Sequence, residues 1–528
     1  AMTPEALRRL ADLKIEQEYG YVQEGAKTAP ASAPATAVAK PALDKPQTVA
    51  LPATGGTGKG AAKAGSIAAA GKDGKESEKN FEKRVARGEQ LQPKKDTALA
   101  APTAEAASDL ENASAREAIE LYQKLLAKYP LYESNDQVLY QLSRAHQELG
   151  EVEKAMDVMN RFVRTYPNSR YMDEVQFRRA EYFFTRKKFL DAEEAYKSVV
   201  AMGKGSSYFE LSLYKLGWSL YKQELYEEGV EKFVDLLDYR VSIGDDFSRL
   251  QSQAEGQRID DTFRVISLSF SNLGGASSVV EFFNLHGKRS YEEKIYSHLA
   301  DFYLDKRRYS DAATAYKTFV DLYPFSEVSP NFHMRMIEIY KKGEFGKLVV
   351  EQKKEFAKTY ALNAEYWRYF DIKKRSDVVG FLKENLKDLA NYYHAGYQNT
   401  RPDAEKRENY REALLWYRNY LASFPSEPES PALHYQMADL MLEGKDFGEA
   451  AVAYEHTAYD YPAHEKSSAA AYAAVYAWRE LLGTLPEGKR GEVRQRSIQS
   501  SLKFADTFPQ HEKVPAVLST TADELYEV

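Results

Sequence analysis

Residues 293–326 constrain the fold more than any other stretch, because they contain two helical stripes separated by a polar turn. The apolar side chains of each stripe recur at spacings of three and four, which places them on one face of a helix. They are Tyr296, Leu299, Ala300 and Tyr303 in the first stripe and Ala312, Tyr316 and Phe319 in the second. Pro324 ends the second helix because it lacks an amide N–H and clashes with the preceding turn. One such hairpin cannot bury its apolar stripes alone, so we expect neighbouring hairpins.

The same hairpin pattern recurs along the chain. An aromatic residue followed by proline ends successive hairpins, at positions 129–130, 166–167, 323–324, 424–425, 461–462 and 508–509. Pro130 and Pro167 lie 37 positions apart, as do Pro425 and Pro462. No segment alternates apolar and polar residues over the length of a strand, so we predict an all-α protein.

The order of large, small and proline positions resembles the tetratricopeptide repeat (TPR) pattern, W-x2-L-G-x2-Y…A-x3-F…P. The resemblance covers about residues 108–526. It is most specific at two sets of positions, Ala300/Ala312/Pro324 and Ala438/Ala450/Pro462. A TPR protein is a superhelical solenoid of antiparallel helix pairs, and we expect that fold here.

Composition divides the chain into six predicted segments. They are a short N-terminal helix (1–22), a low-complexity disordered linker (23–107), an N-terminal TPR array (108–238), an insertion (239–260), central degenerate and regular TPRs (261–375) and a C-terminal TPR array (376–528). The linker has almost no large apolar residue before Phe81 and cannot bury enough surface to fold. Residues 55–60 are glycine-rich like a phosphate loop, but they lack the Ser/Thr after Lys59 and a preceding strand, so we assign them to the linker.

Each end of the sequence contains a predicted helix without an obvious partner. A lone N-terminal helix is marginal in water, so it should either dock onto another element or fray. The stretch 514–526 resembles a first helix without its partner. It is either a capping helix or the start of a further repeat beyond Val528, as expected if the C-terminal array is truncated.

Several functional classes lack their sequence signatures. The net charge is −7 and the isoelectric point about 5.9, so no general attraction to nucleic acid is expected. The chain has no cysteine and no apolar run of the roughly 18 residues that a membrane span needs. The histidines form no i, i+4 pair, and no zinc-protease helix, nucleophile elbow or EF-hand loop occurs. We therefore predict no catalytic residues, no cofactor, no metal and no enzymatic activity.

Stacked hairpins present a long concave wall made by the first helix of each repeat. In the second to fourth repeats this wall is expected to carry large aromatic and charged side chains, which are common interface anchors. They are Tyr140, Arg144, Phe177, Glu181, Phe184, Tyr214, Trp218 and Tyr221. We predict that they bind an extended or helical peptide. Alternatively, these rings pack against the linker, an adjacent superhelical turn or the second helices.

The repeated Tyr-Pro or Phe-Pro ending resembles bacterial envelope TPR proteins. Those include the lipoprotein of the outer-membrane β-barrel assembly machine and the periplasmic coordinator of the Tol-Pal system. Residues 135–145, 173–181 and 216–223 are similar to large proteobacterial TPR proteins found beside ExbB/ExbD/TonB-like proton-driven motors, including those of gliding motility.

The envelope resemblance implies a non-enzymatic periplasmic scaffold, associated with the outer membrane, that binds other envelope proteins or peptides. It also implies a lipid anchor on an N-terminal cysteine, which would have to lie on a leader removed before Ala1. The alternative is a regulatory or binding subunit of an envelope enzyme that builds polysaccharide or peptidoglycan. Co-purification with motor or outer-membrane proteins, or with such an enzyme, separates the two.

Overall fold

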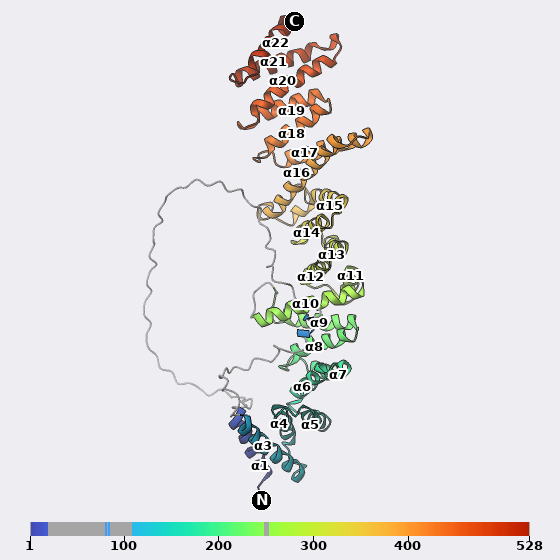
Figure 1. Ribbon diagram of the computed structural model, residues 1–528, viewed down its shortest axis with the longest axis vertical. Coiled ribbons are helices and arrows are strands. Elements are labelled where there is room, and N and C mark those ends of the chain that lie inside the picture. Colours follow the sequence, from blue (N-terminus) through green and yellow to red (C-terminus); the bar gives the residue numbers. More distant parts are fainter. Residues whose placement is uncertain (1, 20–79, 82, 85–107, 248–252, 527–528) are drawn as a thin grey trace, which may run out of the picture. The chain divides into compact units, whose positions relative to one another are not determined.

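The computed structural model describes residues 2–19, 80–81, 83–84, 108–247 and 253–526. Most of the predicted linker, including residues 55–60, lies outside the described residues. Within them the chain forms helices and no strands (Figure 1), which confirms the predicted all-α solenoid. The chain divides into two compact units, Ala1–Gly256 and Gln257–Val528, which we call unit 1 and unit 2.

Unit 1 is a stack of helix pairs in chain order, and each helix contacts the next. The pairs are α1 (Pro4–Tyr19) with α3 (Ser108–Lys128), α4 (Asn135–Glu148) with α5 (Val152–Thr165), α6 (Met172–Thr185) with α7 (Phe189–Ala201), and α8 (Phe209–Lys222) with α9 (Tyr226–Ser242). Helix α10 (Gln253–Leu273) begins at the end of this unit.

Unit 2 continues the same architecture with longer and less regular pairs. Its helices are α11 (Ala276–His286), α12 (Glu292–Asp305), α13 (Tyr309–Leu322), α14 (Ser329–Lys342), α15 (Gly346–Thr359), α16 (Ser376–Asn399), α17 (Asp403–Ser423), α18 (Ser430–Glu443), α19 (Phe447–Tyr459), α20 (Ser467–Thr484), α21 (Gly491–Thr507) and α22 (Val514–Tyr526). Short 3-10 helices lie at η1 (Glu365–Arg368), η2 (Ile372–Lys374) and η3 (Glu487–Lys489).

A small buried residue on each helix marks the point where the two helices of a pair cross. These residues are twelve positions apart, as in Ser143/Ala155, Ala180/Ala192, Gly217/Gly229, Ala300/Ala312 and Ala438/Ala450. Between α8 and α9 both small residues are glycine, and a Cβ on Gly217 would lie 2.7 Å from the ring of Phe233. A Cβ on Gly229 would lie 3.3 Å from the carbonyl oxygen of Gly217. Small side chains therefore set the close approach that the TPR pattern predicts.

The turns are fixed by local backbone chemistry. Tight turns inside the pairs each contain a residue with positive φ: Gly150, Lys187, Glu224, Arg307, Glu344 and Lys445. Where a helix ends at an aromatic residue followed by proline, a serine at the start of the next helix donates a hydrogen bond to the carbonyl of that aromatic residue. Ser329 Oγ donates to the Tyr323 carbonyl at 2.6 Å, and Ser430 Oγ donates to the Phe424 carbonyl at 2.5 Å. Proline ends the helix, and these bonds hold the start of the next one.

The N-terminal helix docks, as one of the two predicted outcomes requires. Leu7, Ala11 and Ile15 of α1 are buried in a cluster shared with α3. The Tyr122 hydroxyl donates to Asp12 Oδ1 at 2.7 Å, and this hydrogen bond is buried. Helix α1 is therefore the first helix of the first pair, and residues 20–107 lie between the two helices of that pair.

Two polar stretches of the sequence take part in helices. Residues 394–407 extend α16 and α17, which leaves only residues 400–402 as a connection. Pro402 is the proline that breaks the helical path there. In the predicted insertion 239–260, α9 continues to Ser242, and the buried Arg240 pairs with Asp245 at 3.0 Å. Residues 363–375, at the end of the central segment, contain two short 3-10 helices, η1 and η2.

Candidate protein-binding site

The eight predicted binding residues lie on α4, α6 and α8, the first helices of three consecutive pairs in unit 1. We call the side chains of these three helices the first-helix face. Five of the eight are buried, with exposed fractions of 5% for Tyr140, 7% for Phe177, 2% for Phe184, 2% for Tyr214 and 0% for Trp218. Arg144, Glu181 and Tyr221 are half-buried. The large rings thus fill the interior of the stack, and the half-buried side chains form the part that a partner can reach.

At the α4 end of the face, Tyr140 joins two repeats. Its ring stacks on Tyr171, with centroids 4.3 Å apart and an interplanar angle of 10°. Its hydroxyl donates to Glu174 Oε2 on α6 at 2.8 Å and accepts from Arg144 Nη1 at 3.2 Å. Burial raises the pKa of Tyr140 to about 12, so the phenol stays protonated and remains a donor.

A second cross-link between α4 and α6 runs through Arg178. Its Nε donates to Gln147 Oε1 at 2.8 Å, and its Nη1 donates to Ser143 Oγ at 3.2 Å. The two helices are therefore tied together by side chains of the face itself. Hydrogen bonds to a charged group contribute about 1.5–3 kcal/mol each, so this part of the face is expected to be rigid.

Between α6 and α8, a buried lysine is held by a carboxylate. Lys215 is 0% exposed, and its Nζ lies 3.4 Å from Glu181 Oε1. The same ammonium lies 4.7 Å from the ring centroid of Phe184, a cation–π arrangement. Glu181 also accepts a hydrogen bond from Tyr196 of α7. Glu181, predicted as a binding residue, thus has a structural role as counter-ion of Lys215.

At the α8 end, Trp218 lies at the centre of an aromatic cluster. Three rings of the same helix pair surround it, with centroid distances of 6.4 Å to Tyr214, 5.4 Å to Tyr221 and 6.3 Å to Phe233. A fourth ring comes from outside the repeats: Phe81 packs edge-on to Trp218 at 5.3 Å with an interplanar angle of 62°. Packing on second helices and on the linker region, the alternative weighed above, therefore occurs at this residue.

The indole of Trp218 is buried without a hydrogen-bond partner. Among the residues that the structure describes, no acceptor lies within reach of its Nε1. A buried donor left unpaired costs about 1–3 kcal/mol. The α8 end of the face therefore combines tight apolar packing with an unmet polar group, a feature that sequence patterns could not reveal.

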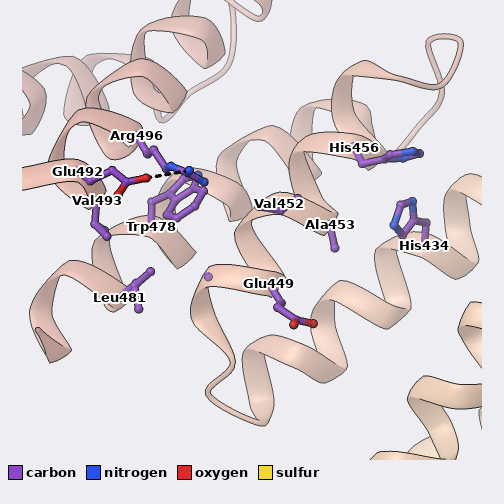
Figure 2. Close-up of a pocket in the computed structure, with 11 residues that line it drawn as sticks. His434, Glu449, Val452, Ala453, His456, Trp478, Leu481, Glu492, Val493 and Arg496 are labelled. Atoms are coloured by element: carbon purple, nitrogen blue, oxygen red, sulfur yellow. Dashed lines mark hydrogen bonds and ion pairs between the residues drawn. The ribbon is translucent and has the colours of Figure 1, made fainter.

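Unit 2 contains a cavity of about 650 Å³ that the sequence did not predict. Its walls come from α18, α19, α20 and α21 (Figure 2). On one side, Arg496 lies 5.6 Å from the ring centroid of Trp478 and pairs with Glu492 at 2.9 Å. Val452 is 51% exposed at the cavity wall. A second cavity, of about 910 Å³, lies among α15, α16 and α17 and includes Lys354 and Trp416.

Two histidines lie at the far wall of the first cavity. The ring centroids of His434 and His456 are 4.4 Å apart, and Tyr461 contacts both. Burial, with a smaller effect of the neighbouring His456, lowers the pKa of His434 to about 4. His434 is therefore neutral at pH 7.

The described part of the chain was searched for metal-binding groups and for membrane-spanning helices. No group of three or more His, Cys, Asp or Glu side chains there could hold a metal ion. The helices that the structure describes include none with the length and apolar character of a membrane span.

Comparison with known proteins gives one family match, which covers part of the chain. Residues 100–202 match the model of the YfiO outer membrane lipoprotein family, which is well under half of the chain. None of the curated proteins matches the sequence.

Among solved structures, the MamA RS-1 ArsTM double mutant is 17% identical, with 36% of this chain and 88% of that chain covered and a TM-score of 0.24. A tetratricopeptide repeat protein from Parabacteroides merdae is 13% identical, with coverage of 53% and 95% and a TM-score of 0.26. The C-terminal part of a TPR protein from Cytophaga hutchinsonii is 13% identical, with coverage of 56% and 98% and a TM-score of 0.23.

Proposed function

We propose that the protein is a non-enzymatic scaffold of the bacterial cell envelope that binds partner proteins or peptides through the first-helix face of unit 1. One observation carries this proposal: a segment outside the repeats already places an aromatic side chain on this face, where Phe81 is fully buried against Trp218. A surface that accepts one such segment has the shape and chemistry to accept another.

The residues on the face support protein recognition. Arg144 and Tyr221 are half-buried, so each presents a charged or aromatic group from a rigid base. Cross-links between α4, α6 and α8 hold these side chains in register, so little side-chain freedom is lost when a partner binds.

The envelope assignment is supported by the match of residues 100–202 to an outer membrane lipoprotein family. With it we propose a periplasmic location associated with the outer membrane, where a lipid anchor on an N-terminal cysteine of the native protein, outside the present sequence, would hold the chain. The resemblance to TPR proteins beside ExbB/ExbD/TonB-like and gliding-motility motors makes such a machine the proposed site of action.

Photo-crosslinking in intact cells tests the proposal. A photoreactive phenylalanine analogue replaces Arg144 or Tyr221 on the face, and Asp157 on α5 or Asp235 on α9 serves as the control position, since both aspartates are exposed on second helices. We expect crosslinks to envelope proteins from positions 144 and 221 and none from 157 and 235. Equal crosslinking from both faces, or partners confined to the cytoplasm, would refute the proposal. An envelope enzyme as the main partner would support the regulatory-subunit alternative.

A further inference from the structure

The short segment around Phe81 is a helical element attached to the repeats of unit 1. Asn80, Phe81, Lys83 and Arg84 are helical, and we call these four residues the Phe81 segment. Phe81 is 0% exposed, although the residues beside it in sequence belong to a stretch that is poor in apolar side chains. Arg84 lies one turn later, with its guanidinium 5.5 Å from the Phe81 ring centroid. The segment therefore contributes one aromatic anchor flanked by cations.

The middle of helix α8 is buried from solvent. Each of residues 211–220 is buried, including Lys215, Ser212 and Ser219. In α6, by contrast, Arg178, Arg179 and residues 181–183 remain half-exposed. A first helix of a solenoid normally keeps one side open to solvent. The buried stretch 211–220 includes Trp218, the residue of α8 on which Phe81 packs.

The fit at this place is incomplete. The Phe81 ring buries the indole of Trp218 but supplies no acceptor for Nε1, and no other described residue supplies one. A ligand that offers an aromatic ring together with a carbonyl, hydroxyl or carboxylate at this position would gain a hydrogen bond that the Phe81 segment does not make. The segment is therefore a ligand that a better one can replace.

We propose that the Phe81 segment is an intrachain ligand that occupies the Trp218 end of the first-helix face and competes there with partner proteins. The partner segment that fits is a short helix with one aromatic anchor, cations on the next turn and an acceptor for the Trp218 indole. This inference rests on the proposed function, because it names the partner chemistry and the regulation of the same face.

Covalent attachment determines how strongly the segment competes. An attached ligand acts at an effective concentration of about 1 mM. If the segment has an intrinsic Kd of about 100 μM, a partner with the same contacts binds the intact chain about tenfold more weakly than a chain without the internal ligand. A partner that also pairs with the indole N–H overcomes this competition.

The first test uses a labelled peptide with the sequence of residues 76–90, titrated into the full-length chain. We expect it to bind Phe81→Ala about tenfold more tightly than the unmodified chain. Phe325→Ala in unit 2 is the matched control, because Phe325 is 40% exposed and contacts Tyr369 rather than the face. This control should bind the peptide like the unmodified chain, and a peptide with alanine at position 81 should not bind Phe81→Ala.

The second test follows Trp218 directly. Removal of the Phe81 ring should expose the indole and shift the tryptophan emission of Phe81→Ala to longer wavelength. The control is the same comparison in chains that also carry Trp218→Phe. There Phe81→Ala should cause no shift, because the remaining tryptophans, Trp367, Trp416 and Trp478, all lie in unit 2. Identical spectra of the unmodified chain and Phe81→Ala would show that Phe81 does not cover Trp218 in solution, and the inference would fall.

The peptide titrations test competition by the Phe81 segment, and the crosslinks test partner binding by the first-helix face. Equal peptide affinity for the unmodified chain and Phe81→Ala would overturn internal competition but leave the face as a binding site. A peptide that binds neither chain, with helicity unchanged by circular dichroism, would show that the segment is no ligand of this face. The crosslinks from positions 144 and 221 would then decide the proposed function independently.

Discussion

Two histidines in unit 2 are buried in their neutral form. Burial lowers the pKa of His333 to about 4, as it does for His434. His333 Nε2 bonds to the Gln352 carbonyl at 3.1 Å and lies near the charges of Lys317 and Asp321. His434 is close to His456 and Asp460. In both cases the low dielectric environment disfavours the imidazolium.

This burial predicts a loss of stability in mild acid. The folded-state pKa lies below the value of about 6.5 in an unfolded chain, so the unfolded state binds more protons between pH 6.5 and about 4. Each histidine should therefore reduce the free energy of unfolding by up to about 3 kcal/mol as the pH falls through this window. Urea unfolding of the chain and of His333→Gln/His434→Gln measures the difference. Parallel pH profiles for the two proteins would contradict the prediction.

The residue types of the first-helix face could be predicted from the sequence, but their exposure could not. Helical periodicity places Trp218 and Phe177 on first helices, and the structure has them there. Periodicity does not show which segment covers a face, because that depends on contacts between distant parts of the chain. Phe81 against Trp218 is such a contact, and the cavity beside His434 likewise depends on how four helices of unit 2 pack.

At the scale of helix pairs, the crossing of α8 and α9 has no spare room. Gly217→Ala would place a methyl group 2.7 Å from the buried Phe233 ring, so the ring or the helix that carries it must shift. Overpacking of this kind costs about 1–3 kcal/mol. Chemical denaturation followed by circular dichroism should show this loss. Gly205→Ala is the control, since its Cβ would meet nothing within 4 Å, and an equal loss in both variants would refute the steric argument.

The pairing of α1 with α3 depends on one buried hydrogen bond as well as on apolar packing. Tyr122→Phe removes the donor from Asp12, which is 7% exposed, and leaves that carboxylate with Arg8 at 3.1 Å. A buried acceptor that loses a partner costs about 1–3 kcal/mol, so α1 should open more often. Hydrogen exchange of residues 4–19 should accelerate roughly tenfold in Tyr122→Phe.

Lys14→Ala provides the control for this prediction. Lys14 and Glu117 form an ion pair between the same two helices, but both side chains are partly exposed, at 33% and 57%. Such pairs contribute about 0–1 kcal/mol. Exchange of α1 should therefore change little in Lys14→Ala. If Lys14→Ala accelerates exchange as much as Tyr122→Phe does, the buried hydrogen bond is not what holds the helix.

The partners of individual helices were harder to predict than the helices themselves. Helix α1 was expected either to dock or to fray, but the sequence did not name the helix on which it would dock. It pairs with α3, which follows it in the chain after residues 20–107. Local patterns report which face of a helix is apolar and are silent on which distant helix covers it. The stretch 394–407 shows the converse limit, since its polar residues carry no clear apolar stripe and still continue two helices.

At the scale of the whole molecule, the repeat pattern predicted the architecture because each pair needs only its neighbours. Contacts in unit 1 run from each helix to the next, and the core cluster from Leu7 to Val175 grows along the chain in the same way. Unit 2 has a cluster of its own that extends from Met334 to Val517. The boundary at Gly256 falls inside the stretch 239–260, where the sequence lacks an apolar stripe.

The pairing of α1 with α3 also means that the amino-terminal end is attached to the protein twice, by peptide bonds and by packing. A protease that cuts once between residues 20 and 79 would then leave α1 in place, and the two fragments would elute together from a sizing column until a denaturant is added. Such a cut would leave Phe81 joined to α3 through the chain on its carboxyl side, so cleavage would keep the internal ligand attached. The two fragments would remain associated through the packing of α1 on α3.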